Sequence, residues 1–174
     1  VAELPRDVPL VLPLGTGYDM DMLSDQLGNP GRIGLLPAFP FGWRNSGLEV
    51  PEPLFWQYIF NLLDSLRDDG FTRVHCLAPQ GIDPQSSFLG GHSASIVRQP
   101  HPSSNAPKPF LPPDGERDKV ILIPIGHTEQ HGYHLPLSVD TIIIEAIAKG
   151  TANANLATRS YTLPVMPYGV STHR

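Results

Sequence analysis

The chain has 174 residues, of which 40% are hydrophobic and 17% are charged, and its formal net charge is −5 at pH 7. This composition is typical of a globular protein with a hydrophobic core, and it excludes a chain that is disordered throughout. The acidic balance, without a basic stripe, argues against nucleic acid as a partner.

Hydrophobic runs in the first half predict buried strands of a parallel sheet. Residues 9–15 read PLVLPLG and end in a glycine turn, and residues 33–42 read IGLLPAFPFG and lead into a rigid proline loop. Between them, Asp19, Asp21 and Asp25 predict a solvated acidic turn and a helix start. The alternative, a site for a hard cation, would need the spacing of a calcium loop, and D-x-D alone does not supply it.

Residues 51–69 carry the clearest helical pattern in the chain. Pro51 or Pro53 suits the first turn of this helix, and Gly70 suits its C-terminal end. The predicted apolar stripe consists of Leu54, Tyr58, Ile59, Leu62, Leu63 and Leu66. We expect the aromatic residues of this segment to pack against a sheet or another subunit rather than to form a substrate cage. They are Phe55, Trp56, Tyr58 and Phe60.

Residues 71–78 predict the next strand, which contains His75 and Cys76. We interpret these two as core or face residues, because cysteine catalysis needs a base and an orienting group nearby and none is marked. A single cysteine excludes an internal disulfide and favours a reducing, cytoplasmic location. We expect no membrane partner, since no run approaches the roughly 18–20 apolar residues that cross a bilayer and no signal-peptide pattern is present.

Residues 99–118 are rich in proline, serine and asparagine and lack apolar periodicity. They predict an extended, semi-rigid linker, for which a simple tether is favoured over a role as a proline-motif ligand. The predicted organisation is therefore a first unit at 1–98, the linker at 99–118 and a second unit at 119–174. His92, between glycine-rich neighbours in the first unit, is expected to be a surface loop histidine rather than a ligand.

The second unit contains the chemistry-bearing loop. Residues 120–126 predict a buried strand and residues 141–149 a helix of the buried kind, with a polar loop between them. Glu129 and His131 are two positions apart, so in an extended segment their side chains project to the same side. Asp140 returns at the start of the helix, where its two oxygens could bridge two ions.

An oxygen-and-imidazole ligand set suits zinc, manganese or iron(II), and the absence of thiolate argues against a structural zinc site. Two divalent ions roughly 3.5–4 Å apart polarise a carbonyl and hold a hydroxide nucleophile at neutral pH. Three candidate ligands are too few for two ions, so further ligands must come from elsewhere.

The loop at 129–140, EQHGYHLPLSVD, resembles the signature E-Q-H-G-x-H-L-P-L-x-x-D of the creatininase (creatinine amidohydrolase) family. Residues 163–173, LPVMPYGVSTH, resemble the P-x-x-P-Y-G-x-S-x-H stretch that follows in that family. The resemblance implies an α/β fold, with three α/β/α layers and a mostly parallel sheet. It also implies a metal-dependent hydrolase that cleaves non-peptide, cyclic or formyl amide C–N bonds.

By matching position, the resemblance makes Glu129, His131 and Asp140 the metal ligands, with Asp140 bridging two ions. The remaining ligands of the family, a His and a Glu, come later in its sequence, beyond Arg174. We therefore expect a companion chain to carry the rest of the catalytic domain. The resemblance also suggests a homo-oligomer.

Other residues of the matched segments are candidates for supporting roles. His134 and His173 are candidates for proton transfer, and for His134 a hydrogen bond that orients the loop is an equal alternative. Tyr168 and Ser171 are candidates for lining the pocket.

The first unit repeats the strand pattern of the second. VLPLG at 11–15 matches LIPIG at 122–126, and LLPAFPFG at 35–42 matches TLPVMPYG at 162–169, which we interpret as a diverged internal repeat. The first copy is 16 residues shorter between the matched segments, where the second has its metal loop. Gln80 also stands where the family has a histidine, so we expect the first copy to be metal-free.

We expect a metal-dependent amidohydrolase that acts on a small-molecule amide through a metal-activated hydroxide, together with the companion chain. The alternative is a non-catalytic subunit or binding module of the same family with an incomplete metal centre. A phosphoesterase with the same two-metal logic is less favoured, because the chain has no basic cluster for phosphate.

Overall fold

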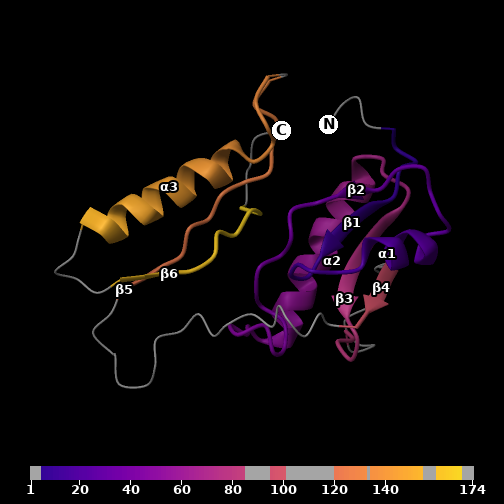
Figure 1. Ribbon diagram of the computed structural model, residues 1–174, viewed down its shortest axis with the longest axis horizontal. Helices are drawn as coiled ribbons and strands as arrows, with labels where there is room; N and C mark the ends of the chain where they lie inside the picture. The colour runs from indigo at the N-terminus through magenta and orange to yellow at the C-terminus, as the bar shows by residue number, and fades with distance from the viewer. Residues whose placement is uncertain (1–4, 85–94, 101–119, 133, 155–159, 170–174) are drawn as a thin grey trace. The chain divides into compact units, whose positions relative to one another are not determined.

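The computed structural model describes residues 5–84, 95–100, 120–132, 134–154 and 160–169 (Figure 1). The chain divides into two compact units, Val1–Lys108 and Pro109–Arg174. Both contain parallel strands and helices, so the predicted α/β class with a parallel sheet is confirmed.

The first unit contains a four-stranded sheet in the order β2-β1-β3-β4, with every neighbouring pair parallel. The strands are β1 (Leu10–Pro13), β2 (Gly34–Leu35), β3 (Val74–Pro79) and β4 (Ser95–Gln99). Strands β1 and β2 lie inside predicted segments, β3 extends one residue beyond the predicted segment 71–78, and β4 was missed by the sequence analysis. Gln99, where the linker was expected to begin, is the last residue of β4 and is buried.

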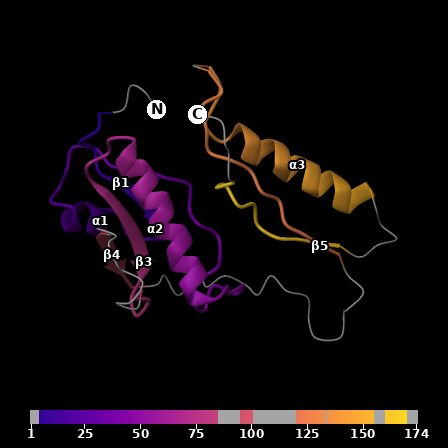
Figure 2. The same ribbon diagram turned by 180° about the vertical axis from the view of Figure 1, so that it is seen from behind.

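Two helices flank this sheet. Helix α1 (Met20–Gln26) begins after Asp19, whose side chain accepts hydrogen bonds from the backbone N–H groups of Asp21 and Met22, both at 2.9 Å. The acidic helix start is thus confirmed. Helix α2 (Glu52–Asp68) follows Pro51 and is followed by Gly70, whose positive φ of 92° suits a residue beyond a helix end. Figures 1 and 2, which view the molecule from opposite sides, show α2 along one face of the sheet and α1 toward the other.

The buried face of α2 differs from the predicted stripe. Its buried residues are Phe55, Trp56, Ile59, Phe60 and Leu63, whereas Leu54 is 60% exposed. The aromatic rings pack against one another, with centroids 5.2 Å apart for Phe55 and Trp56 and 5.7 Å apart for Phe55 and Phe39. The larger rings therefore determine which side faces the core, and the expectation that they pack rather than form a cage is confirmed.

The second unit contains β5 (Val120–Leu122), α3 (Val139–Ala154) and β6 (Ser160–Thr162). The two strands pair in parallel, and α3 begins two residues before and ends five residues after the predicted segment 141–149. The expectation of a buried strand at 120–126 is wrong, because β5 covers only Val120–Leu122 and its first two residues are exposed. The expectation of a buried helix is wrong, because Ala148 is the one buried residue of α3. Among its isoleucines, Ile142, Ile143 and Ile147 are 52% to 55% exposed. None of the described helices has the length and apolarity needed to cross a membrane.

The two units share one hydrogen-bond register. Val11 pairs with Leu35 as the matching Leu122 pairs with Thr162. Three backbone hydrogen bonds of the first unit have counterparts in the second. The bond from Leu36 N to Val11 O corresponds to the bond from Leu163 N to Leu122 O. Phe39 N to Pro13 O corresponds to Met166 N to Pro124 O. Gly15 N to Phe39 O corresponds to Gly126 N to Met166 O, and all six distances are between 2.8 and 2.9 Å. The difference in length between the matched segments leaves this ladder unchanged.

Cys76 should be unreactive in the folded protein. Its side chain is fully buried in β3, and burial raises the pKa of the thiol to about 12, so the nucleophilic thiolate is suppressed. We expect a thiol reagent such as DTNB to label the native chain slowly and to label one cysteine per chain at once after denaturation. Rapid labelling of the native protein would contradict this position for Cys76.

Candidate metal centre

The loop that carries the candidate ligands is anchored at its start by two glycines. Gly126 follows β5, and its N–H donates to the carbonyl oxygen of Met166 at 2.8 Å. Gly169 donates in turn to the carbonyl oxygen of Gly126, also at 2.8 Å. The Thr128 hydroxyl donates to the carbonyl oxygen of Pro167 at 2.9 Å, which ties the next turn of the loop to the same segment. The loop therefore leaves the carboxyl end of β5 in a fixed direction.

Gly126 also lies directly against the first turn of α3. A Cβ atom at this position would be 2.7 Å from the Cα of Thr141 and 2.8 Å from its hydroxyl oxygen. At Gly169 a Cβ would be 2.6 Å from the carbonyl oxygen of Gly126. Because real side chains do not tolerate such distances, only glycine lets the loop, the helix start and the segment after β6 approach so closely.

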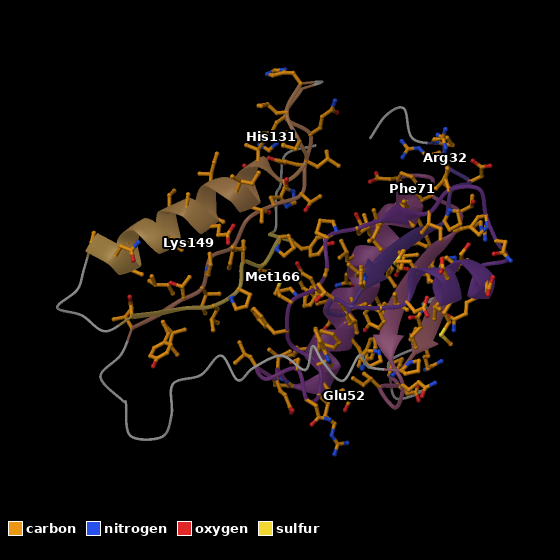
Figure 3. The ribbon with its side chains drawn as sticks, viewed as in Figure 1. Arg32, Glu52, Phe71, His131, Lys149 and Met166 are labelled. Carbon is orange, nitrogen blue, oxygen red and sulfur yellow. The ribbon has the colours of Figure 1, made fainter. Side chains whose placement is uncertain are left out.

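This approach brings His131 to Asp140, in the first turn of α3. Figure 3 labels His131 beside the end of α3 where the loop joins it, far along the helix from Lys149. The ring atom Nε2 of His131 lies 3.1 Å from Oδ1 of Asp140. The other ring atom, Nδ1, lies 3.1 Å from the backbone carbonyl oxygen of Glu129.

Both ring nitrogens of His131 therefore face acceptor oxygens. A neutral imidazole has one N–H group, and it can satisfy only one of the two. The arrangement is balanced either by a protonated ring or by a cation between Nε2 and the Asp140 carboxylate. In the second case the bond from Nδ1–H to the carbonyl of Glu129 fixes the tautomer that presents Nε2 as a ligand, as is usual for histidines that bind metals.

Glu129 completes the group. One ligand atom from each of Glu129, His131 and Asp140 lies within 4.8 Å of the others, and all three side chains are half-buried. In the described part of the chain no other group of three such side chains comes together in this way. Two carboxylates and an imidazole fit zinc, manganese or iron, and three protein ligands leave a position open for water or substrate.

The sequence analysis missed a neighbouring histidine, His127. Its Nε2 lies 3.5 Å from Oε2 of Glu129, while its Nδ1 is enclosed and has no hydrogen-bond partner in the described structure. The signal was present, because His127, Glu129 and His131 alternate along an extended segment and so share one side of it. The Thr141 hydroxyl, also enclosed, likewise has no such partner.

The remaining predicted residues have varied positions. His134 is exposed, with its ring beside the turn at Gly132, which has a φ of 75°. Tyr168 is buried. His173 and Ser171 lie outside the described residues, as does His92.

A family model matches the part of the chain that contains this loop. It is the model Creatininase, described as creatinine amidohydrolase, and it matches residues 112–174. This segment is therefore similar to the creatininase family. The matched segment contains the strand, the loop with all three candidate ligands, helix α3 and strand β6, so the creatininase-type segment and the clustered side chains coincide.

Among the relatives are proteins named mycofactocin precursor peptide peptidase. The protein of Mycobacterium tuberculosis (strain CDC 1551 / Oshkosh) is 42% identical over 59 residues. This alignment covers 29% of this chain and 23% of the relative. The protein of Mycobacterium ulcerans (strain Agy99) is 59% identical over 32 residues. This alignment covers 18% of this chain and 13% of the relative. The chain thus spans less than a quarter of the length of these relatives. No solved structure matches the chain.

Replacing Gly126 by alanine should distort the candidate centre. The added methyl group would push α3 from the loop, which should lower the stability of the second unit by about 1–3 kcal/mol and weaken metal binding. Amide hydrogen exchange in α3 and titration with Co²⁺ would measure both effects.

Gly150→Ala provides the matched control, since nothing lies within 4 Å of a Cβ there. Because alanine favours the helix over glycine, this variant should gain about 0.5–1 kcal/mol. Both tryptophans lie in the first unit, so the tryptophan fluorescence of each variant should match wild type. An unchanged α3 in Gly126→Ala would show that the glycine contact is dispensable.

Proposed function

We propose that this protein is a metal-dependent amidohydrolase whose centre is held by Glu129, His131 and Asp140. The single observation that carries the proposal is His131, whose two ring nitrogens both face oxygen acceptors at 3.1 Å. Glu129, His131 and Asp140 would hold a divalent cation, and the Nδ1–H group of His131 would then donate to the carbonyl oxygen of Glu129. The family of the matched segment, which is described as creatinine amidohydrolase, supports hydrolysis of an amide as the reaction.

The residues of the loop would have different roles in metal binding and proton transfer. Water activation and polarisation of an amide carbonyl are the chemistry that a divalent ion supplies in such a site, and two ions share it in related centres. Asp140, at the start of α3, has two carboxylate oxygens and would serve both ions if two are bound. His134 is exposed beside the loop and is the candidate for giving a proton to the leaving nitrogen, and His173 is the second candidate for this role.

The substrate proposed is a small cyclic or formyl amide. The name of the mycobacterial relatives, mycofactocin precursor peptide peptidase, adds a peptide amide to the substrates that deserve assay. The competing proposal is a non-catalytic subunit or binding module, which the shortage of ligands for a second ion favours if the chain acts alone.

We propose further that a companion polypeptide covers the second unit and supplies the remaining ligands. In the first unit β1 pairs on both edges, with β2 and β3, whereas among the described strands β5 pairs only with β6. Ile123 and Ile125 are 58% and 57% exposed, although their counterparts Leu12 and Leu14 are fully buried. Apolar surface of this extent is typical of an interface, and a homo-oligomer is the alternative source of cover.

The shared register supports the proposal that the first unit, residues 1–98, is a diverged copy without a metal. Asp19 there caps a helix. The Tyr18 hydroxyl donates to the carbonyl oxygen of Leu14 at 2.6 Å, and burial raises its pKa, so it remains a neutral phenol. These residues are used in local structure rather than gathered around one point.

Removing a ligand should remove the metal. We expect Glu129→Ala and His131→Ala to lose most of the bound zinc, manganese or iron that elemental analysis detects in wild type, with any companion chain present. Glu145→Ala is the control, because this carboxylate lies on α3 with its oxygen 2.7 Å from the ammonium of Lys149. Unchanged metal content in the first two variants would refute the ligand assignment.

Hydrolysis assays would separate the enzyme from the binding module. Creatinine, formamides and short peptide amides should be tested with the chain alone and together with its companion, after loading with Zn²⁺ or Mn²⁺. The proposal expects turnover of at least one class, lost in His131→Ala. Metal binding without turnover in either preparation would favour the non-catalytic subunit.

A further inference from the structure

We propose that His127 is a positioning residue that holds the Glu129 carboxylate for the metal. The inference rests on the proposed metal centre and adds a residue that the family signature at 129–140 does not include. Its basis is the contact between Nε2 of His127 and Oε2 of Glu129, at 3.5 Å, together with the enclosed Nδ1 on the other side of the ring.

The surroundings of the ring determine which nitrogen carries the hydrogen. If Nδ1 carried it, a buried N–H would lack an acceptor and the lone pair of Nε2 would face a carboxylate oxygen, and both are unfavourable. If Nε2 carries it, the N–H group lies on the nitrogen that is 3.5 Å from Oε2 of Glu129, and only a lone pair remains enclosed. The second tautomer is therefore favoured, and with it His127 offers a donor to Glu129.

This donation bears on the metal centre because a carboxylate ligand needs a fixed orientation. Glu129 lies in a loop without helix or strand structure and is half-buried, so a polar neighbour can help to select the orientation of its carboxylate. A donor to one oxygen leaves the other oriented toward His131 and Asp140. His127 follows Gly126, the anchored start of the loop, so the donor is itself held in place.

Metal affinity in the full chain tests the role directly. Titration with Co²⁺ or Zn²⁺ should give a dissociation constant raised by about 10- to 100-fold in His127→Ala. His127→Gln, whose amide N–H₂ is a donor, should restore most of the affinity. Gln130→Ala, an exposed residue of the same loop, is the control and should bind as wild type does. The Co²⁺ absorption spectrum should be unchanged in His127→Gln, because the ligand set is the same.

Three results would overturn the proposal. Unchanged affinity in His127→Ala would show that the ring has no such role. Loss of affinity in His127→Gln, with a Co²⁺ spectrum that indicates one nitrogen ligand fewer, would make His127 a ligand instead. Imidazole ¹⁵N–¹H correlation spectra of the metal-free chain at alkaline pH should show the Nε2–H tautomer, and an Nδ1–H tautomer would contradict the donation.

Glu129→Ala and His131→Ala in the same titration keep the two proposals apart. If they lose the metal while His127→Ala does not, the centre stands and the positioning role fails. If all three variants bind as wild type does, or if wild type binds no ion, the centre itself is refuted and the role of His127 with it.

Discussion

The second unit depends on one close approach, that of Gly126 to Thr141 at the start of α3. The hydrogen bonds from Gly126 to Met166 and from Gly169 to Gly126 hold the loop in the plane of the parallel pair. The missing side chain then lets the helix begin directly against it. As a result, Asp140 reaches a histidine nine positions earlier in the chain, and three side chains that are dispersed in sequence meet within 4.8 Å.

Much of this arrangement could be predicted from local pattern. The apolar runs predicted parallel strands at residues 9–15 and 120–126, and the carboxylates and histidine of the loop predicted their own cluster, because alternation and a helix start are determined by near neighbours. Strand β4 was missed, since only two of its five residues, Ile96 and Val97, are apolar, and its buried residue is the polar Gln99. It forms only because β3 provides a partner edge.

Other features depend on packing that a single sequence does not express. Phe55, Trp56 and Phe60 together determine which face of α2 is buried. The stripe that was predicted from apolar residues alone therefore differs in part from the buried face. The exposed isoleucines of α3 were predicted to be buried because apolar side chains tend to be covered. The sequence does not show which part of the structure would cover them. The burial of Nδ1 of His127, which has no hydrogen-bond partner among the described residues, likewise has no signal in the sequence.

The two units have the same backbone hydrogen bonds but different residues between the matched segments. Each unit forms the same three hydrogen bonds between its matched segments, yet the first encloses the short helix α1 and the second a longer insertion with the candidate ligands and helix α3. The backbone hydrogen bonds between the matched segments therefore accommodate insertions of different length and sequence. The same three bonds form around insertions of different length, so the N-terminal unit is a natural scaffold onto which the loop of residues 127–140 could be grafted.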